Sequence, residues 1–313
     1  MKFIITGALG HIGSKLIREL GNSYPKSNII MIDNLMTQRY CSLFNLPNTA
    51  TYKFIEDDIL NLDLPEIFKG SNAIFQLAAI TNAAGSFEQK EQVEYNNFNT
   101  TEKIAEACCI TNSPLIHLSS TSVYGTQKDI VDESCSDDEL QPQSPYANTK
   151  LSEEKLLKAL CKTDNLRFVT CRFGTIFGIS PGMRFHTAVN KFCWQAAMGK
   201  PITVWETAYE QKRPYLDLDD AVKALMFIVE RKLFDGEIYN ILTHNLTVKD
   251  IIESIGNNIT NINIEFVKAE IMNQLSYNVS NNKFCDLGFE FRGNLDKAIN
   301  NTIDLLKNSN SIK

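Results

Sequence analysis

The sequence has no long hydrophobic run. None of its stretches approaches the ~18 consecutive apolar residues that a membrane-spanning helix requires. The apolar run at the N-terminus, Phe3 to Ile5, meets a glycine turn at once and is too short for the hydrophobic region of a secretory signal peptide. We therefore predict no membrane association and a cytoplasmic location.

The eight cysteines lack the spacing of a metal site or of a disulfide framework. No two of them form a CxxC pair, and no histidine stands at metal-ligand spacing beside them. We therefore predict no metal site and free thiols in a reducing compartment. Four cysteines fall at apolar strand or helix positions, where a thiol behaves as a small hydrophobic group: Cys108, Cys161, Cys171 and Cys193.

Clusters of positive charge are also missing. The 31 Lys and Arg residues are scattered, and 37 Asp and Glu residues bring the net charge to -6. This balance repels a phosphate backbone at long range, so we predict no nucleic-acid partner. It still permits a local basic pocket that binds one diphosphate.

What is present is an alternation of two hydrophobic periods. With 313 residues, 43% of them hydrophobic, the chain can bury a sizeable core. Its first half alternates short apolar runs with longer segments of helical spacing, which predicts an α/β fold with a doubly wound parallel sheet. The expected strands are 3–5, 28–32, 52–55, 73–77, 115–118 and 168–171, and the expected helices lie within 12–20, 93–109 and 147–160.

A glycine-rich loop follows the first expected strand, with the pattern TGxxGxxG from Thr6 to Gly13. Glycines permit the tight turn and a close approach of the backbone to a pyrophosphate, which binds at the N-terminus of the next helix. The position between a strand and a helix supports the motif. The loop predicts a dinucleotide site that includes Gly7, Leu9, Gly10, His11, Ile12 and Gly13.

Acidic residues end the second and third expected strands. Asp33 stands twenty positions beyond Gly13, where a carboxylate can accept hydrogen bonds from both adenosine ribose hydroxyls and repel a 2′-phosphate. This favours NAD over NADP, although Asp33 and Asn34 could also simply begin a turn. Asp58 could accept from the adenine amino group while Ile59 packs on the ring; an ordinary acidic loop is the alternative.

A YxxxK pair lies on the helix expected from residue 147. Tyr146 and Lys150 are four residues apart, so both side chains project from one helical face. A nearby ammonium stabilises a phenolate and lets a tyrosine act as a base near neutral pH. A half-buried tyrosine beside a solvated lysine is the simpler explanation. The hydroxyl-rich run Ser119 to Ser122, at the end of the fifth expected strand, favours a catalytic role for the pair.

Taken in order, these motifs resemble those of the extended short-chain dehydrogenases/reductases, the NAD-dependent epimerases and dehydratases of nucleotide-sugars. The resemblance covers nearly the whole chain and implies a Rossmann fold, NAD as cofactor, a nucleotide-sugar substrate and a homodimer. It implies that Ser120 is the catalytic hydroxyl, Tyr146 the base and Lys150 its partner. It adds Leu77, Ala78, Ala79 and Asn97 to the cofactor site, which Tyr146 and Lys150 share.

The same resemblance implies a substrate site and a division of the chain. Arg213 falls on the arginine that grips the nucleotide diphosphate, and Trp205 on a position that can stack on the base or belong to the core. The other implied substrate residues are Thr81, Ser122, Thr175, Arg184 and Asn190. We predict an NAD-binding domain of residues 1–174 with 212–241, and a smaller substrate-binding lobe of 175–211 and 242–313.

Departures from the family pattern narrow the function. Thr121 and Ser122 occupy the positions of the acidic pair that supplies the acid and base for water elimination in 4,6-dehydratases, so dehydration is not expected. Thr175 stands where the family pattern has a substrate-binding Asn, and Gln76 stands where it has a His. Glu206 stands where it has a Gly that shapes the sugar pocket. Ser180 to Arg184 resembles a run in a branch that handles GDP-heptoses.

The sequence therefore predicts reversible hydride transfer at a ring carbon of a nucleotide-sugar, with C4 favoured. Reduction of the keto intermediate on its other face makes a 4-epimerase; release after one transfer makes a dehydrogenase or a keto-sugar reductase. These three activities use the same groups for proton and hydride transfer, so the sequence does not decide between them. A non-catalytic NAD-sensing protein is the remaining alternative. Such a protein needs the glycine loop but does not need Ser120, Tyr146 and Lys150 together, so the presence of all three argues against it.

Overall fold

The core of the molecule is a seven-stranded parallel sheet in the strand order β3-β2-β1-β4-β5-β7-β11. The computed structural model describes residues 1–81, 90–125, 129–268 and 276–307. Six strands confirm those expected from the sequence, and β11 extends the sheet beyond β7. Their bounds are β1 Lys2–Thr6, β2 Asn28–Asp33, β3 Thr51–Glu56, β4 Ala73–Gln76, β5 Leu115–Ser120, β7 Phe168–Phe173 and β11 Ile238–Ile241.

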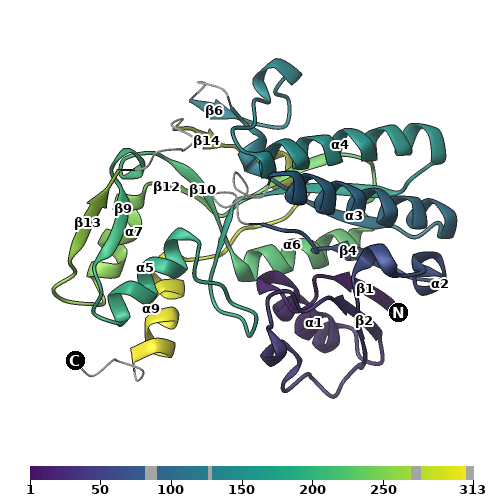
Figure 1. The fold of residues 1–313 in the computed structure, drawn as a ribbon, viewed down its shortest axis with the longest axis horizontal. Helices are drawn as coiled ribbons and strands as arrows, with labels where there is room; N and C mark the ends of the chain where they lie inside the picture. Colours follow the sequence, from purple (N-terminus) through teal and green to yellow (C-terminus); the bar gives the residue numbers. More distant parts are fainter. Residues whose placement is uncertain (82–89, 126–128, 269–275, 308–313) are drawn as a thin grey trace.

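Helices cover both faces of this sheet, as the doubly wound prediction requires. On one face, α3 (Lys90–Thr111) packs along α4 (Pro145–Asp164), with the short α2 (Leu64–Phe68) beside them (Figure 1). On the other face, α1 (His11–Ser23) packs against α6 (Leu218–Arg231).

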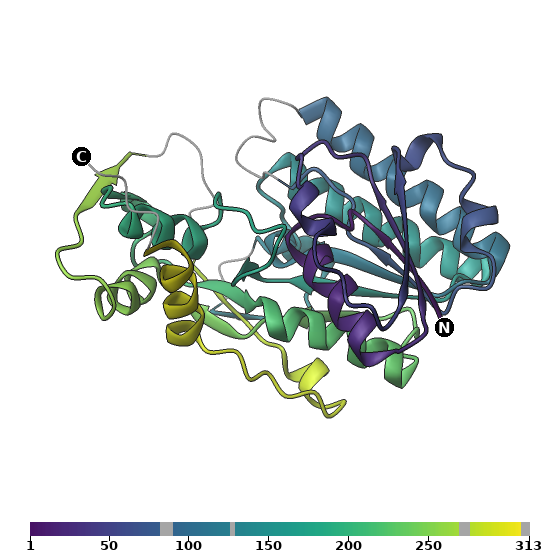
Figure 2. The ribbon, with the colours of Figure 1, turned by 90° about the horizontal axis from the view of Figure 1, so that it is seen from below.

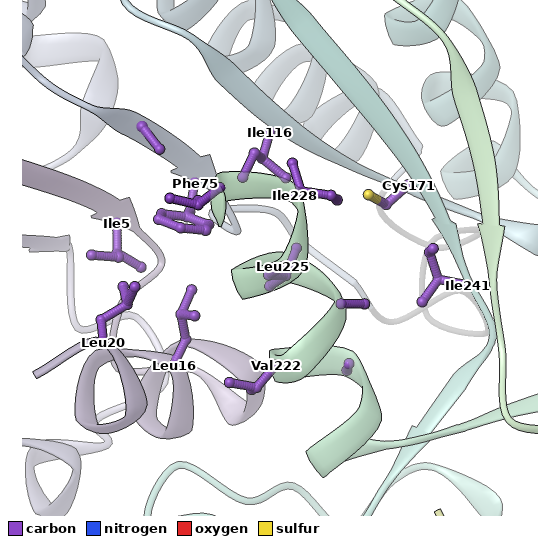
Figure 3. Close-up of a cluster of buried hydrophobic side chains, with 14 of the residues drawn as sticks. Ile5, Leu16, Leu20, Phe75, Ile116, Cys171, Val222, Leu225, Ile228 and Ile241 are labelled. Carbon is purple, nitrogen blue, oxygen red and sulfur yellow. The ribbon is translucent and has the colours of Figure 1, made fainter. Parts of the chain in front are cut away.

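The core beneath α1 and α6 joins early and late parts of the chain. Leu16 and Leu20 of α1 meet Leu225 of α6 and Phe75 of β4, all fully buried (Figure 3). Burying such side chains stabilises the fold by about 1.5–3 kcal/mol each. Residues 218–241, which hold α6 and β11, therefore pack with the N-terminal sheet. The division of the chain into two domains stays a prediction.

A second lobe lies beyond the carboxyl ends of the parallel strands (Figures 1 and 2). Its apolar core includes Val189, Ile252 and Ile303 from three different helices. The described residues also form three small sheets, β12-β10-β8, β13-β9 and β14-β6.

The strands and α-helices of the described residues not yet named have the following bounds: β6 Ile130–Val131, β8 Thr175–Phe177, α5 Ala188–Ala197, β9 Ile202–Trp205, β10 Arg213–Asp217, β12 His244–Leu246, α7 Val248–Gly256, β13 Ile264–Val267, β14 Asn278–Val279, α8 Asn282–Cys285 and α9 Leu295–Leu306.

The described residues include neither a membrane-spanning helix nor a metal-binding cluster. None of their helices has the length and apolar character needed to cross a membrane. They also hold no group of three or more His, Cys, Asp or Glu side chains arranged to bind a metal ion. Of the four cysteines expected at apolar positions, Cys108, Cys171 and Cys193 are buried and Cys161 is half-buried.

Candidate active site

A cavity of about 670 Å³ lies where the carboxyl ends of the parallel strands face the second lobe. Open α/β sheets bind ligands at this edge, where the strand order reverses. Here the reversal lies between β1 and β4, and the loops after both strands line the cavity. Trp205 at the end of β9 and Arg213 at the start of β10 also line it.

The glycine loop has the tight geometry expected of a pyrophosphate site. Gly7 has a φ of +63°, and a Cβ there would lie 2.7 Å from Ala78 N. A Cβ on Gly13 would lie 2.6 Å from the carbonyl oxygens of Gly7 and Ala8. Gly10 caps α1 without a side-chain hydrogen bond, so the first N–H groups of the helix remain available for an anion. These features fit the pyrophosphate of NAD.

Asp33 closes β2 at the cavity wall and already holds two loops. Its Oδ2 accepts from Leu9 N and its Oδ1 from Leu35 N, each at 3.0 Å. An ionised carboxylate has about four lone-pair sites, so two remain for ribose hydroxyls. The side chain is thus fixed in place and can still bind a ligand.

Asp58 has a clear structural role. It caps a short 3-10 helix through Leu60 N at 2.9 Å, and its Oδ2 accepts from Asn34 Nδ2 at 3.0 Å. Asp58, Asn34 and Ile59 all line the cavity, as expected from the sequence. The contact between Asp58 and adenine stays a prediction.

The three expected catalytic groups line the same cavity. Ser120 ends β5, and its Oγ accepts from Ser122 Oγ at 2.9 Å. Tyr146 and Lys150 lie in the first two turns of α4, which Ser144 caps through Ala147 N. Lys150 Nζ lies 5.9 Å from the Tyr146 ring centroid, and the lysine is only 4% exposed. The simpler explanation, a solvated lysine, is wrong.

A layer of buried charges lies behind these groups. Lys150 Nζ donates to Glu153 Oε2 at 2.8 Å, and His117 Nε2 of β5 lies 2.8 Å from the same oxygen. Glu154, the next residue, pairs with Arg172 of β7 through Nε at 3.0 Å and Nη2 at 2.6 Å. Each buried cation therefore has its own carboxylate, which a buried charge requires.

Four basic groups line the cavity beside the glycine loop. They are Arg39, Arg184, His11 and His186. Burial, followed by the two arginines, lowers the pKa of His11 to about 3 and that of His186 to about 4, so both rings are neutral at pH 7. Arg184 Nη1 donates to Thr81 Oγ1 at 2.5 Å, and its Nε has no hydrogen-bond partner among the described residues. The two guanidinium groups give this wall a positive charge.

The expected substrate residues line the lobe side. Arg213 is largely buried, stacks at 5.5 Å over the Tyr277 ring and donates to Gln211 Oε1 at 2.9 Å. Its Nη1 donates to the carbonyl of Lys212 at 3.0 Å. Trp205 also lines the cavity and is 38% exposed, which does not suit a core tryptophan. Thr81, Ser122, Thr175 and Arg184 complete the set.

Three expected site residues lie behind the cavity wall. Leu9 is buried, with its N–H on Asp33. Asn97 is bonded through both side-chain atoms to the backbone of Ile80, so it supports the loop after β4. Asn190 accepts from Gly178 N and donates to the Arg184 carbonyl. The cavity lining includes all the other expected residues.

Several groups of the site were not predicted from the sequence. Arg39 lies shortly after Asp33 in the sequence. An arginine in a loop next to a dinucleotide motif could have been named as a candidate for the cofactor site. Glu153 lies three residues after Lys150, a spacing that also describes ordinary surface pairs. His117 and His186 gave no periodic signal, because their roles depend on which elements pack together.

Comparison with known proteins gives one family. The family described as "NAD dependent epimerase/dehydratase family" matches residues 3–241. YtcB of Bacillus subtilis, described as an uncharacterized UDP-glucose epimerase, is 32% identical over 250 residues, 77% of this chain and 76% of that protein. A trifunctional UDP-glucose 4,6-dehydratase/UDP-4-keto-6-deoxy-D-glucose 3,5-epimerase/UDP-4-keto-L-rhamnose-reductase of Arabidopsis thaliana is 29% identical over 316 residues, 96% of this chain and 46% of that protein. The chain spans about half the length of these Arabidopsis relatives.

Solved structures of similar fold cover the whole chain. UDP-glucuronic acid 4-epimerase from Bacillus cereus, in complex with UDP-glucuronic acid and NAD, has a TM-score of 0.84 and 28% identity, and covers 99% of this chain and 100% of its own. UDP-N-acetylglucosamine 4-epimerase from Methanobrevibacter ruminantium has a TM-score of 0.86 at 23% identity, with 98% of both chains covered, and shows the fold alone.

Proposed function

Because the chain belongs to the NAD dependent epimerase/dehydratase family, we propose that it is a 4-epimerase of a nucleotide-sugar. NAD is its cofactor, and Gly7, Gly13, Asp33 and the N-terminus of α1 would hold it. The single observation that carries the proposal is that Ser120, Tyr146 and Lys150 line one cavity with this glycine loop.

The residues divide the chemistry as follows. Tyr146, as phenolate, takes the proton of the sugar hydroxyl while the C–H bond of that carbon breaks and a ketone forms. Lys150 stabilises the phenolate by its charge, and Ser120 polarises the sugar oxygen. Bound NAD supplies the hydride acceptor and later the donor. Rotation of the keto-sugar before the hydride returns inverts the carbon.

Elimination of water needs a carboxyl group near the reacting carbons, and the described residues that line the cavity offer none there. Among its described lining residues the acids are Asp33, Asp57 and Asp58, all at the ends of β2 and β3. The residues after Ser120 are Thr121 and Ser122, whose hydroxyl groups are too weakly acidic for this role. This supports an enzyme without 4,6-dehydratase activity, although relatives that carry that activity match the chain.

The substrate class follows from the shape and charge of the site. Arg213 and Trp205, which line the same cavity, suit a nucleoside diphosphate, with the guanidinium on the phosphates and the indole on the base. Neighbours of similar structure are described with UDP-sugars. We take a UDP-hexose or UDP-hexuronic acid as the first substrate to test.

The proposed assembly is a homodimer, as the family resemblance implies. On α3, the side chains of Tyr95 (69% exposed) and Ile110 (72% exposed) are candidates for this contact. Light scattering coupled to size exclusion would test it, and a monomer at micromolar concentration would contradict it.

The experiment is a turnover assay of the NAD-loaded protein with UDP-, GDP-, CDP- and dTDP-sugars, with products identified by proton NMR. The proposal expects the C4 stereoisomer of one substrate at an equilibrium ratio. A dehydrated product, or a free keto-sugar with stoichiometric NADH, would replace it by a dehydratase or a dehydrogenase. No turnover of any sugar, with NAD still bound, would favour a non-catalytic protein.

A further inference from the structure

Lys150 is held by a buried carboxylate that the proposed chemistry does not use. Its ammonium donates to Glu153 Oε2 at 2.8 Å, and that oxygen is also 2.8 Å from His117 Nε2. The other ring nitrogen of His117 lies 3.3 Å from Thr170 Oγ1 of β7. The side chains of Glu153 and His117 are 0% exposed. The three groups form a chain that leads from α4 into the sheet.

The charges in this chain are defined by their surroundings. Burial lowers the pKa of His117, against the effect of Glu153, so the ring is neutral at working pH. Burial alone would raise the pKa of Glu153, but Lys150 and His117 outweigh it and keep the carboxylate ionised. Burial alone would likewise lower the pKa of Lys150, but Glu153 and Tyr146 hold it above its ordinary value. Lys150 and Glu153 are thus a neutral pair.

Other charged groups surround Tyr146 and this pair. The titratable and charged neighbours are Glu154 on α4, His117 on β5, Arg172 on β7 and, facing Tyr146 from the loop after β8, Arg184. Glu154 is bound by Arg172 through two nitrogens, so its charge is already compensated. Glu153 is the carboxylate in contact with Lys150.

We propose that Glu153 is a positioning residue that fixes the Lys150 ammonium, offsets its charge and so sets the pH at which Tyr146 becomes a base. The inference rests on the proposed role of Tyr146. His117 supports it from behind by fixing the carboxylate. A lysine alone would stabilise the Tyr146 phenolate strongly. A lysine paired with a carboxylate stabilises the phenolate less, but the carboxylate holds the ammonium in a fixed position.

The expected size of the effect follows from the distances. Nζ lies 2.8 Å from Oε2 and 5.9 Å from the Tyr146 ring centroid, so the carboxylate is within about 9 Å of the ring. A unit charge at that separation, with an effective dielectric constant of about 20, shifts a pKa by roughly one unit. Removing a negative charge favours the phenolate, so Tyr146 should ionise at lower pH without Glu153.

The test is an ultraviolet difference titration of the phenolate in the NAD-loaded protein. Wild type and Glu153→Gln are each measured against the same protein carrying Tyr146→Phe. The Tyr146 midpoint should fall by about one pH unit in Glu153→Gln. The acid limb of the kcat/KM profile should move by the same amount. An unchanged or raised midpoint overturns the proposal.

His117→Gln is the matched control, because the glutamine amide can keep the hydrogen bond to Glu153 Oε2 and no charge is removed. Its midpoint should stay within a few tenths of a unit of wild type. An equal shift in both variants would mean a structural effect and overturn the charge argument. If Glu153→Gln does not fold, Glu153→Asp retracts the carboxylate and should lower the midpoint by a smaller amount; an unchanged midpoint there overturns the proposal. The titration needs no sugar, so a shift without turnover refutes the proposed function alone.

Discussion

Single side chains decide the chemistry, and their partners decide what each can do. Tyr146 and Lys150 project from one helical face, as the YxxxK spacing predicts. Lys150 is nevertheless a buried group with a carboxylate partner, which the spacing does not show. The pair was predictable from the sequence, but its environment was not, because His117 reaches Glu153 only through the packing of α4 on β5.

Tyr146→Phe tests the proposed base. The ring remains, so NAD affinity should stay near normal, while turnover should fall by about 10²–10⁴-fold because the acidic hydroxyl is lost. Steady-state rates together with NAD titration by fluorescence give both numbers. A loss of turnover below tenfold would show that another group removes the proton.

Arg213→Ala tests the diphosphate contact. Loss of a charge-assisted hydrogen bond, about 1.5–3 kcal/mol, should lower kcat/KM for the nucleotide-sugar by about 10- to 150-fold and leave NAD binding unchanged. Arg213→Lys is the control and should recover part of the loss, because it keeps the charge without the planar fork. An unaltered KM in the alanine variant would move the diphosphate elsewhere, with Arg184 the next candidate.

Helices and strands were the most predictable level of this molecule. The helices expected within 12–20, 93–109 and 147–160 all form, as α1, α3 and α4. Their apolar periodicity is local and can be read directly. The small sheets β14-β6 and β13-β9 were not predicted as pairs, because each joins segments far apart in the chain and their register depends on the fold.

The junction of β10 and α6 makes a pH-dependent contribution to stability. Asp217 caps α6 through Asp219 N at 2.8 Å and is only 8% exposed. Burial, then Asp220, raises its pKa to about 6. Well below pH 3.8 the carboxyl is protonated in both the folded and unfolded states. As the pH rises from 3.8 to about 6, the unfolded state ionises before the folded state, so the folded state is progressively destabilised, and above about pH 6 the loss is complete.

Asp217→Asn should therefore stabilise the protein at pH 7.5 by up to roughly 2–3 kcal/mol, since the amide oxygen can still cap the helix. Most of the gain should be lost at pH 4, because the carboxyl is then protonated in the folded state and partly protonated in the unfolded state. Urea unfolding at both pH values measures it. Asp219→Asn is the control: that neighbour is largely exposed and pairs with Lys15, so its loss should bring no such gain. A less stable Asp217→Asn variant at pH 7.5 would contradict the account.

At the scale of the whole molecule, the site exists only because the lobe returns to the sheet. Arg184 contacts Thr81 across 103 positions of sequence, and His11 lies 2.9 Å from the carbonyl of Gly178 in the loop after β8. Family motifs predicted the residues on both sides. They did not predict that Arg39, His11 and His186 would share one wall, because that depends on how the two parts meet.

The central claim is that the chain moves a hydride from C4 of a nucleotide-sugar and returns it to the same carbon. The most direct measurement uses the substrate found in the turnover assay, deuterated at C4, with the NAD-loaded protein. We expect an epimer of unchanged mass that keeps its deuterium at C4, because one bound cofactor accepts the deuteride and returns it to the same carbon. Loss of the label, its transfer to another carbon, or a product lighter by one water would contradict it.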